Sequence, residues 1–104
     1  MIEVRLHKKK GRIFAFELSG HSGYADAGSD IVCAAASSAA QFAILGIEDT
    51  EKLRCEYAVF DGGIEFSLFE PSDIAQSYLE TLEVFLGQLS QQYDKFLKIT
   101  VMEE

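Results

Sequence analysis

Apolar and polar side chains alternate along four segments of the chain, with the period of half-buried β-strands. The first segment covers residues 2–7, and after the turn sequence KKKG a second covers 14–18. The third covers 53–59, and after the turn sequence DGG a fourth covers 64–68. Alternating segments joined by a short turn predict two β-hairpins. In the second segment the side chains expected to be buried are Phe14, Phe16 and Leu18.

Two further segments predict helices. Asp30 is a good N-cap for a helix over about 31–45, whose alanines allow close approach of another element and which Gly46 ends. A longer helix begins at Ser72 and carries apolar residues at spacings of three and four. Its predicted apolar stripe consists of Ile74, Tyr78, Leu82, Phe85, Leu89 and Tyr93. A last strand over 97–101 closes the chain.

The predicted order of elements is therefore ββαββαβ. This order is typical of the α+β class, with two helices packed as one layer on a mostly antiparallel sheet. The sequence contains no repeat of fixed period, no low-complexity tract and no linker, so we expect a single domain over residues 1–104.

Charge narrows the choice of partners. Nine Lys and Arg residues against seventeen Asp and Glu give a formal net charge of −8. This excess of acid argues against binding nucleic acid through phosphate contacts and suits a basic partner. The N-terminal sequence lacks an apolar signal core, and no uninterrupted apolar run approaches the length that spans a membrane. We therefore expect a cytoplasmic protein with no membrane partner, whose two cysteines are free thiols.

The clearest candidate chemistry lies where the first helix begins. With Asp30 as the cap, Cys33 falls in the first turn, where backbone N–H groups have no partner within the helix. Those groups and the helix dipole favour a thiolate, which is the nucleophilic form of cysteine. The nearby Asp30 carboxylate opposes this effect. The same N–H groups are also candidates for an oxyanion hole.

A histidine lies in the loop that precedes this helix. Gly20 and Gly23 give the loop the freedom to fold His21 back over the helix end, where an imidazolium would favour the Cys33 thiolate. A cysteine nucleophile, a histidine base and amide donors together are the components of a cysteine protease. The loop has few apolar anchors, so we expect substrate binding to bring His21 into reach of Cys33.

Each of these residues also has a purely structural interpretation. A lone cysteine such as Cys33 is often a small buried apolar residue. Asp30 is either a cap alone or also orients His21. Ser37 lies one turn after Cys33 and either supports the site or bonds back to the helix backbone. Tyr24 is either a wall of a substrate pocket or an aromatic side chain that pins the loop to the core.

Metal binding is the rival use of the same side chains. His7, His21, Cys33 and Cys55 are the available zinc ligands, but none are paired at the spacing of two to four residues that zinc sites show. Cys55 lies within an alternating strand and is interpreted as a core residue. We therefore expect neither a metal nor another cofactor.

The stretch GHSGYADAGSDIVCAAASS resembles the signature of the ribosomal-processing cysteine protease family, Prp. Matching positions are Gly20, His21, Gly23, Tyr24, Ala25, Gly28, Asp30, Ile31, Val32, Cys33, Ala34, Ala35 and Ser37. Two positions depart from the pattern: Ala36 stands where members commonly carry valine, and Ser22 where they commonly carry alanine. Both are small, and we expect them to affect only local packing.

The resemblance implies a cysteine endopeptidase that removes a short N-terminal extension from a large-subunit ribosomal protein, one that reaches the peptidyl-transferase centre. It implies cleavage after an aromatic-rich segment and a homodimeric enzyme. By the same resemblance Cys33 is the nucleophile and His21 its general base, while Asp30 and Ser37 occupy signature positions with supporting roles. A chain of charge −8 would attract a basic ribosomal protein. The alternatives are a non-catalytic module that binds a ribosomal protein during assembly, and a thiol redox sensor.

Overall fold

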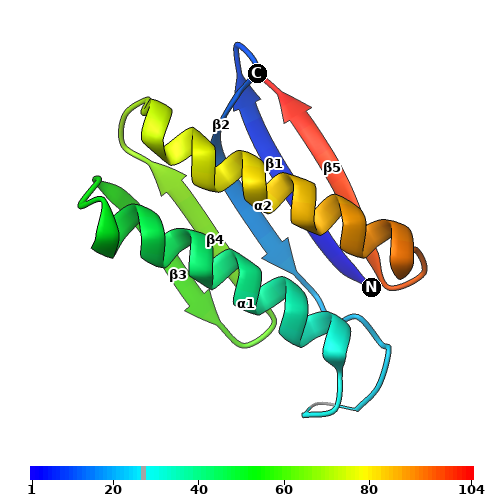
Figure 1. Cartoon of the computed structure of the whole chain (residues 1–104). Helices are drawn as coiled ribbons and strands as arrows, with labels where there is room; N and C mark the ends of the chain where they lie inside the picture. Colours follow the sequence, from blue (N-terminus) through cyan, green and yellow to red (C-terminus); the bar gives the residue numbers. More distant parts are fainter. Residues whose placement is uncertain (27) are drawn as a thin grey trace.

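The computed structural model describes residues 1–26 and 28–104 as a five-stranded sheet with two helices on one face (Figure 1). The elements follow the order ββαββαβ, which confirms the predicted α+β fold. In chain order they are β1 (Ile2–Lys9), β2 (Arg12–Ser19), α1 (Ile31–Leu45), β3 (Cys55–Phe60), β4 (Gly63–Leu68), α2 (Asp73–Gln92) and β5 (Leu97–Glu103). A single π-helical turn, Gly46–Thr50, follows α1.

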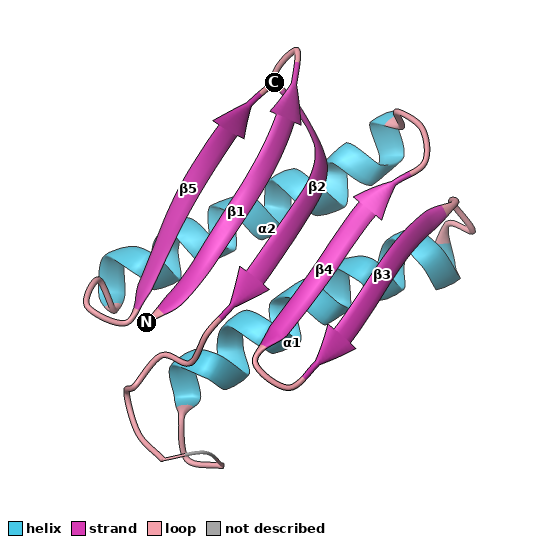
Figure 2. Cartoon of the chain, turned by 180° about the vertical axis from the view of Figure 1, so that it is seen from behind, coloured by secondary structure: helices cyan, strands magenta, loops and turns pink. Residues whose placement is uncertain are grey.

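The strands lie in the order β3-β4-β2-β1-β5. Neighbouring strands are antiparallel except β1 and β5, which are parallel. The chain crosses from β4 to β5 through α2, and both helices cover the same face, so the other face of the sheet is open (Figure 2). At one edge of the sheet β3 pairs with β4 alone among the described strands.

The core lies between the sheet and the helix layer. Phe16 and Phe66 stack there with ring centroids 5.1 Å apart. On α1 the buried positions are mostly alanine, which lets this helix lie close to the sheet and to α2. The buried apolar residues of the sheet are Ile2, Val4, Leu6, Ile13, Ala15, Phe16, Leu18, Ile64, Phe66 and Leu97.

The predicted alternation in β2 is wrong at its start, because the register shifts between His7 and Lys8. Ile13 is buried as a result, while Phe14 is only partly buried and faces the His7 ring. The strand also runs past the end of β4, whose pairing with β2 begins at Ala15. The Gln76 side chain of α2 occupies this place: it accepts the Ile13 N–H at 2.9 Å and donates to the Ile13 carbonyl at 2.6 Å.

The apolar stripe of α2 differs from the predicted one. Ile74 and Phe85 are exposed, although both were expected to be buried. The helix turns a neighbouring set of residues towards the sheet, and Tyr78 and Tyr93 lie at its margin, partly buried. Its buried side chains are Ala75, Gln76, Leu79, Leu82, Leu86 and Leu89.

α1 ends at Leu45 with Gly46 as its C-cap, as predicted, but Gly46 is not a left-handed cap. It has right-handed helical angles, φ −61° and ψ −45°, and the chain continues into the π-helical turn. Its importance lies in packing, because a Cβ at this position would overlap the Tyr78 ring of α2. The Tyr78 hydroxyl then donates to Glu51 at 2.9 Å, which joins the end of this turn to α2.

By length and average composition the segment Ile31–Thr50 could span a membrane, although Ser37, Ser38 and Gln41 interrupt its apolar run. In the fold one side of its helix packs in the core. Val32, Ala36 and Ala40 are fully buried against the sheet and α2.

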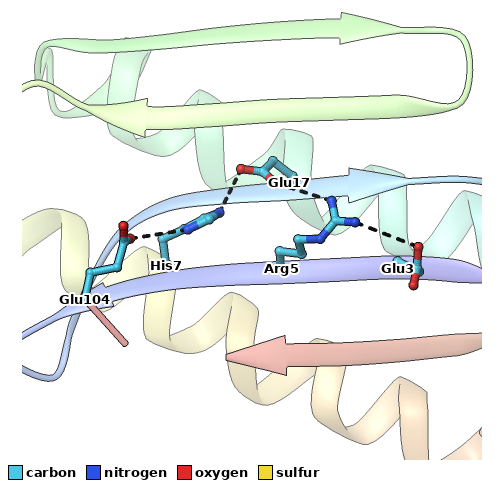
Figure 3. A network of polar contacts seen from close by, with 5 residues as sticks. All are labelled: Glu3, Arg5, His7, Glu17 and Glu104. Atoms are coloured by element: carbon cyan, nitrogen blue, oxygen red, sulfur yellow. Dashed lines mark hydrogen bonds and ion pairs between the residues drawn. The ribbon is translucent and has the colours of Figure 1, made fainter. Parts of the chain in front are cut away.

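A row of charged side chains lies along β1 and β2 on the open face of the sheet (Figure 3). His7 lies between two carboxylates, with Nε2 2.8 Å from Glu17 and Nδ1 3.4 Å from Glu104. Arg5 continues the row, 3.6 Å from Glu17 and 4.0 Å from Glu3. His7 is therefore held on the face opposite the helices, away from the start of α1, and does not join the other residues considered as zinc ligands.

Replacing Gln76 with Met tests the link between α2 and β2. The substitution keeps the length of the side chain but leaves the buried Ile13 N–H and carbonyl without partners, so the free energy of unfolding should fall by about 1–3 kcal/mol. Urea unfolding measures this change. Gln91→Met, at an exposed position of the same helix, is the control and should change it little. Equal stability of the two variants would contradict this role.

Candidate active site

The start of α1 is fixed by Asp30, as predicted. Asp30 has extended backbone angles, φ −85° and ψ 98°, and one carboxylate oxygen, Oδ1, accepts the N–H groups of Val32 at 3.1 Å and Cys33 at 2.9 Å. These two donors are therefore already used. The amides of Val32 and Cys33, which the sequence made candidates for an oxyanion hole, are therefore not free to bind a substrate oxygen while Asp30 accepts them.

Several donors converge on the Asp30 carboxylate. Burial alone would raise its pKa, but the hydrogen bonds from the Cys33 amide, the Ser22 hydroxyl and the amides of Ala25 and Val32 outweigh this effect. The pKa of Asp30 is therefore lowered from its ordinary value. At neutral pH the carboxylate is ionised and holds the helix start together with the preceding loop.

Ser22 is a residue of the site whose importance the sequence did not reveal. Its side chain is buried, with 3% of the residue exposed. The hydroxyl donates to Oδ2 of Asp30 and accepts the Tyr24 N–H at 3.0 Å. The backbone N–H of Ser22 donates to Cys33 Sγ at 3.3 Å. The hydroxyl that departs from the family pattern thus fixes the peptide unit that contacts the sulfur.

His21 is held between the start of β1 and the turn that joins β3 to β4. The Gly20 N–H donates to the Gly62 carbonyl at 2.9 Å, and the His21 ring nitrogen Nε2 lies 3.4 Å from the place where a Cβ on Gly62 would be. Gly20 has φ +91°, and a Cβ there would lie 2.7 Å from the Met1 carbonyl oxygen. Only glycine fits this position, so Gly20 sets where the His21 backbone runs.

His21 and Cys33 open into one cavity of about 160 Å³. Over residues 1–26 and 28–104 no hydrogen bond joins the His21 ring to Cys33 Sγ. The sulfur instead accepts a hydrogen bond from the Ser22 amide. Ser37 lines the same cavity, and its hydroxyl accepts from Gln41 at 2.9 Å rather than bonding to the helix backbone. The other lining residues are Ile2, Leu18, Ser19, Gly20, Ala36, Val59, Phe60, Gly62, Gly63 and Ile64.

Tyr24 points to a different part of the molecule. Its ring packs edge-on against Tyr93 and Phe96, with centroids 5.5 and 5.3 Å away. In the described part of the chain neither Tyr24 nor Gly23 lines the cavity around Cys33. The contacts favour the interpretation that Tyr24 pins the loop, here to the end of α2, rather than that it walls a substrate pocket.

Cys55 is the second free thiol and is partly buried against the core. Burial and the nearby Glu48 carboxylate raise its pKa, so it remains a thiol at neutral pH. Among the described residues there is no group of three or more His, Cys, Asp and Glu side chains placed to hold a metal ion. Glu48 itself accepts the Tyr57 hydroxyl at 2.9 Å.

A thiol at a capped helix start and an imidazole in the same cavity are the two kinds of side chain that a cysteine peptidase uses. The comparison with known families agrees: the sequence model of the family described as cysteine protease Prp matches residues 1–98. The chain belongs to the cysteine protease Prp family.

Solved structures with a similar fold include two of a Prp protease. The ribosomal processing protease Prp from S. aureus, in complex with a covalently linked product peptide, is 26% identical with a TM-score of 0.90, over 97% of this chain and 99% of that one. The same protease with a substrate peptide is 25% identical with a TM-score of 0.85, over the same shares of both chains. SMU.848 from Streptococcus mutans is 25% identical with a TM-score of 0.82, over 100% of this chain and 96% of that one. No curated protein matches the chain.

Ser22→Ala should destabilise the protein most at neutral pH. Because hydrogen bonds lower the folded-state pKa of Asp30, their stabilisation is full above the ordinary carboxyl pKa and is lost as the pH falls through the folded-state value. Removing the Ser22 hydroxyl brings that pKa back towards its ordinary value. Urea unfolding of the wild-type and Ser22→Ala proteins should therefore show a difference in the free energy of unfolding that becomes smaller as the pH falls into the acidic range. Ser29→Ala, in the same loop, is the control; a difference that widens in acid would be inconsistent with this network.

The two thiols should also differ in reactivity. Iodoacetamide should modify Cys33, which opens into the cavity, faster at neutral pH than Cys55, whose raised pKa keeps it protonated. Mass spectrometry of the single-thiol proteins Cys55→Ser and Cys33→Ala measures each rate separately. Modification of Cys55 should accelerate as the pH rises into the alkaline range. Equal rates at neutral pH would show that the surroundings of Cys55 do not protect it.

Proposed function

We propose that this protein is a cysteine endopeptidase that removes the N-terminal extension of a large-subunit ribosomal protein, with Cys33 as nucleophile and His21 as general base. Membership of the Prp family supports the reaction class. The observation that carries the residue assignment is the shared cavity, into which the Cys33 thiol and the His21 ring both open. The related S. aureus enzyme in complex with substrate and product peptides supports a peptide substrate.

The proposed reaction has two steps. Cys33 Sγ attacks the scissile carbonyl carbon and gives its proton to His21, which passes it to the leaving amine as the C–N bond breaks. Water then attacks the thioester carbon and gives a proton to His21, which passes it to Cys33 Sγ as the C–S bond breaks and the new carboxylic acid leaves. Because no hydrogen bond joins His21 to Cys33 among the described residues, we propose that bound substrate brings the two side chains together.

The remaining candidate residues position these two. Asp30 holds the first turn of α1 and, through the Ser22 hydroxyl, the amide that contacts Cys33 Sγ. The donor that faces the reacting sulfur is thus the Ser22 amide, and not the amides of the first turn of α1. Ser37 borders the cavity one turn along α1 from Cys33. Gly62 supports the His21 ring from the β3–β4 turn.

The proposed partner is a basic ribosomal protein precursor, which a net charge of −8 would attract. The same excess of acid disfavours docking on ribosomal RNA. We also propose that the enzyme is a cytoplasmic homodimer, which the family resemblance supports.

Cleavage of the precursor tests the function. The protein should shorten the precursor ribosomal protein by the mass of its extension, and Cys33→Ala should slow this cut by roughly a thousandfold or more, as should His21→Ala. Alanine is favourable in a helix, so the Cys33→Ala protein should remain folded. Cys55→Ser is the matched thiol control and should keep most of the activity.

Two results would count against the proposal. Cleavage that persists in folded Cys33→Ala and fails in folded Cys55→Ser would mean that the nucleophile is misassigned. Tight binding of the precursor without any cleavage by the unaltered protein would favour a non-catalytic module that binds the ribosomal protein.

A further inference from the structure

The backbone donor that faces the Cys33 sulfur comes from the loop and not from the helix. The Ser22 N–H donates to Cys33 Sγ, with the nitrogen 3.3 Å from the sulfur. The amides of Val32, Cys33 and Ala34, which begin α1, all donate to Asp30 instead. Three amides of the first turn are therefore bonded within the cap, and the Ser22 amide is directed at the reacting atom.

The peptide unit between His21 and Ser22 is held on both sides. The Met1 nitrogen donates to the His21 carbonyl at 2.6 Å. The buried Ser22 hydroxyl is fixed between Oδ2 of Asp30 and the Tyr24 N–H. A hydrogen bond to the carbonyl of a peptide unit polarises that unit and makes its N–H a stronger donor. The Ser22 amide is thus fixed in direction and strengthened before any substrate binds.

An acyl-transfer reaction needs such a donor at the carbonyl oxygen. When a sulfur attacks a carbonyl carbon, the C–S bond forms and an electron pair of the C=O bond moves to the oxygen. The resulting oxyanion is attached to the same carbon as the sulfur, so a donor already in contact with Cys33 Sγ lies within reach of it. Donors of this kind are most effective when the protein holds them in place before the reaction.

We propose that the Ser22 N–H is the oxyanion donor of the proposed endopeptidase. In the free protein the N–H donates to Cys33 Sγ, and as the C–S bond forms its acceptor changes from the sulfur to the oxyanion, with no transfer of its proton. When the intermediate collapses, the electron pair returns to the carbonyl, the C–N bond breaks, and His21 gives its proton to the leaving amine. This inference rests on the proposed endopeptidase function and adds the group that stabilises the developing negative charge.

Ser37 is the rival donor. Its hydroxyl accepts from Gln41 at 2.9 Å, and the residue lines the cavity that contains Cys33 and His21. The hydroxyl proton can therefore point into the cavity. The Ser22 amide is favoured because it already contacts the sulfur, whereas no hydrogen bond joins Ser37 to Cys33 in the part of the chain that the structure describes.

Chemical synthesis can remove the Ser22 N–H alone. The full chain is assembled from three synthetic segments by ligation at its two cysteines. In one protein the His21–Ser22 peptide bond is replaced with an ester, which deletes the N–H and keeps the serine side chain. The control protein has an ester before Lys10, in the β1–β2 turn, whose N–H has no hydrogen bond to the described residues. The synthetic protein with all its amides is the reference.

Three reactions of Cys33 are compared in these proteins. The first is cleavage of a peptide that spans the cut in the precursor ribosomal protein. The second is reversible addition to an aldehyde of the same peptide that ends at the residue before the cut. The product of this addition carries an oxygen where the oxyanion would lie, so its affinity reports the donor without turnover. The third is alkylation by iodoacetamide at neutral pH, which forms no oxyanion and so reports the sulfur alone.

The ester at Ser22 should lower kcat by roughly a hundredfold or more, as the loss of a single oxyanion donor does, and should change KM little. It should weaken aldehyde binding by a similar factor and slow the alkylation of Cys33 much less. The ester at Lys10 should change all three values little. Unchanged cleavage by the Ser22 ester would overturn the proposal, as would equal losses in cleavage and alkylation, which would mean that the N–H acts on the sulfur alone.

Nuclear magnetic resonance tests the same donor without altering the chain. In the all-amide protein, labelled with ¹⁵N at Ser22, the Ser22 amide proton should move downfield when the peptide aldehyde binds, because its acceptor changes from sulfur to oxygen. This measurement applies even where the ester protein does not fold. A Ser22 resonance that does not move while the aldehyde occupies Cys33 would overturn the proposal.

Failure of the proposed function gives a different result. If the all-amide protein does not cut the peptide, the endopeptidase function fails, and the donor is still tested by aldehyde affinity and by the Ser22 resonance. Equal aldehyde affinity of the all-amide and Ser22-ester proteins would overturn this inference, as would the absence of binding to both. If Ser37→Ala weakens aldehyde binding and the ester at Ser22 does not, Ser37 is the donor and the proposal is wrong.

Discussion

The arrangement of the candidate site depends on the hydrogen bonds that converge on the Asp30 carboxylate. One oxygen caps α1 and so fixes the backbone of Cys33, and the other holds the Ser22 hydroxyl. Ser22 in turn binds the Tyr24 amide and directs its own amide to Cys33 Sγ. A single carboxylate therefore joins the helix that carries the thiol to the loop that carries His21. Because buried polar groups are costly without partners, these groups hold one another in place.

The rest of the fold supplies the frame for this carboxylate. Buried alanines bring α1 close to the sheet, and Gly46 lets Tyr78 of α2 pack against the end of α1. The β3–β4 turn then places Gly62 beside the His21 ring. The thiol lies on a helix fixed by its core contacts, whereas the histidine lies on a loop that is held by a few hydrogen bonds and by the Tyr24 ring. This difference supports the proposal that bound substrate completes the site.

The sequence predicted the order of elements, the start of α1 and the segment that carries Cys33 and His21, because those features have local signals: alternation, a capping residue and a motif. It misplaced features that depend on distant contacts. The bulge between β1 and β2 turned Ile13 inward, and the packing of α2 exposed Ile74 and Phe85. Ser22 and Gly62 were missed as parts of the site, since neither a small loop residue nor a hairpin glycine shows in sequence which side chain it will contact. An N-cap carboxylate accepts the N–H groups of the first turn. The sequence could therefore have predicted that Asp30 occupies the amides of Val32 and Cys33.

The central claim is the proposal that Cys33, assisted by His21, is the nucleophile that attacks the scissile peptide bond. The most direct measurement uses a peptide chloromethyl ketone that ends at the residue before the cut, because such a reagent alkylates a thiol much faster once it is bound as a substrate than from solution. Mass-spectrometric mapping should find the label on Cys33, lost when His21 is replaced by alanine or when the aromatic residues of the peptide are replaced by serine. Labelling of Cys55, or labelling of Cys33 that ignores both the histidine and the aromatic residues, would contradict the account.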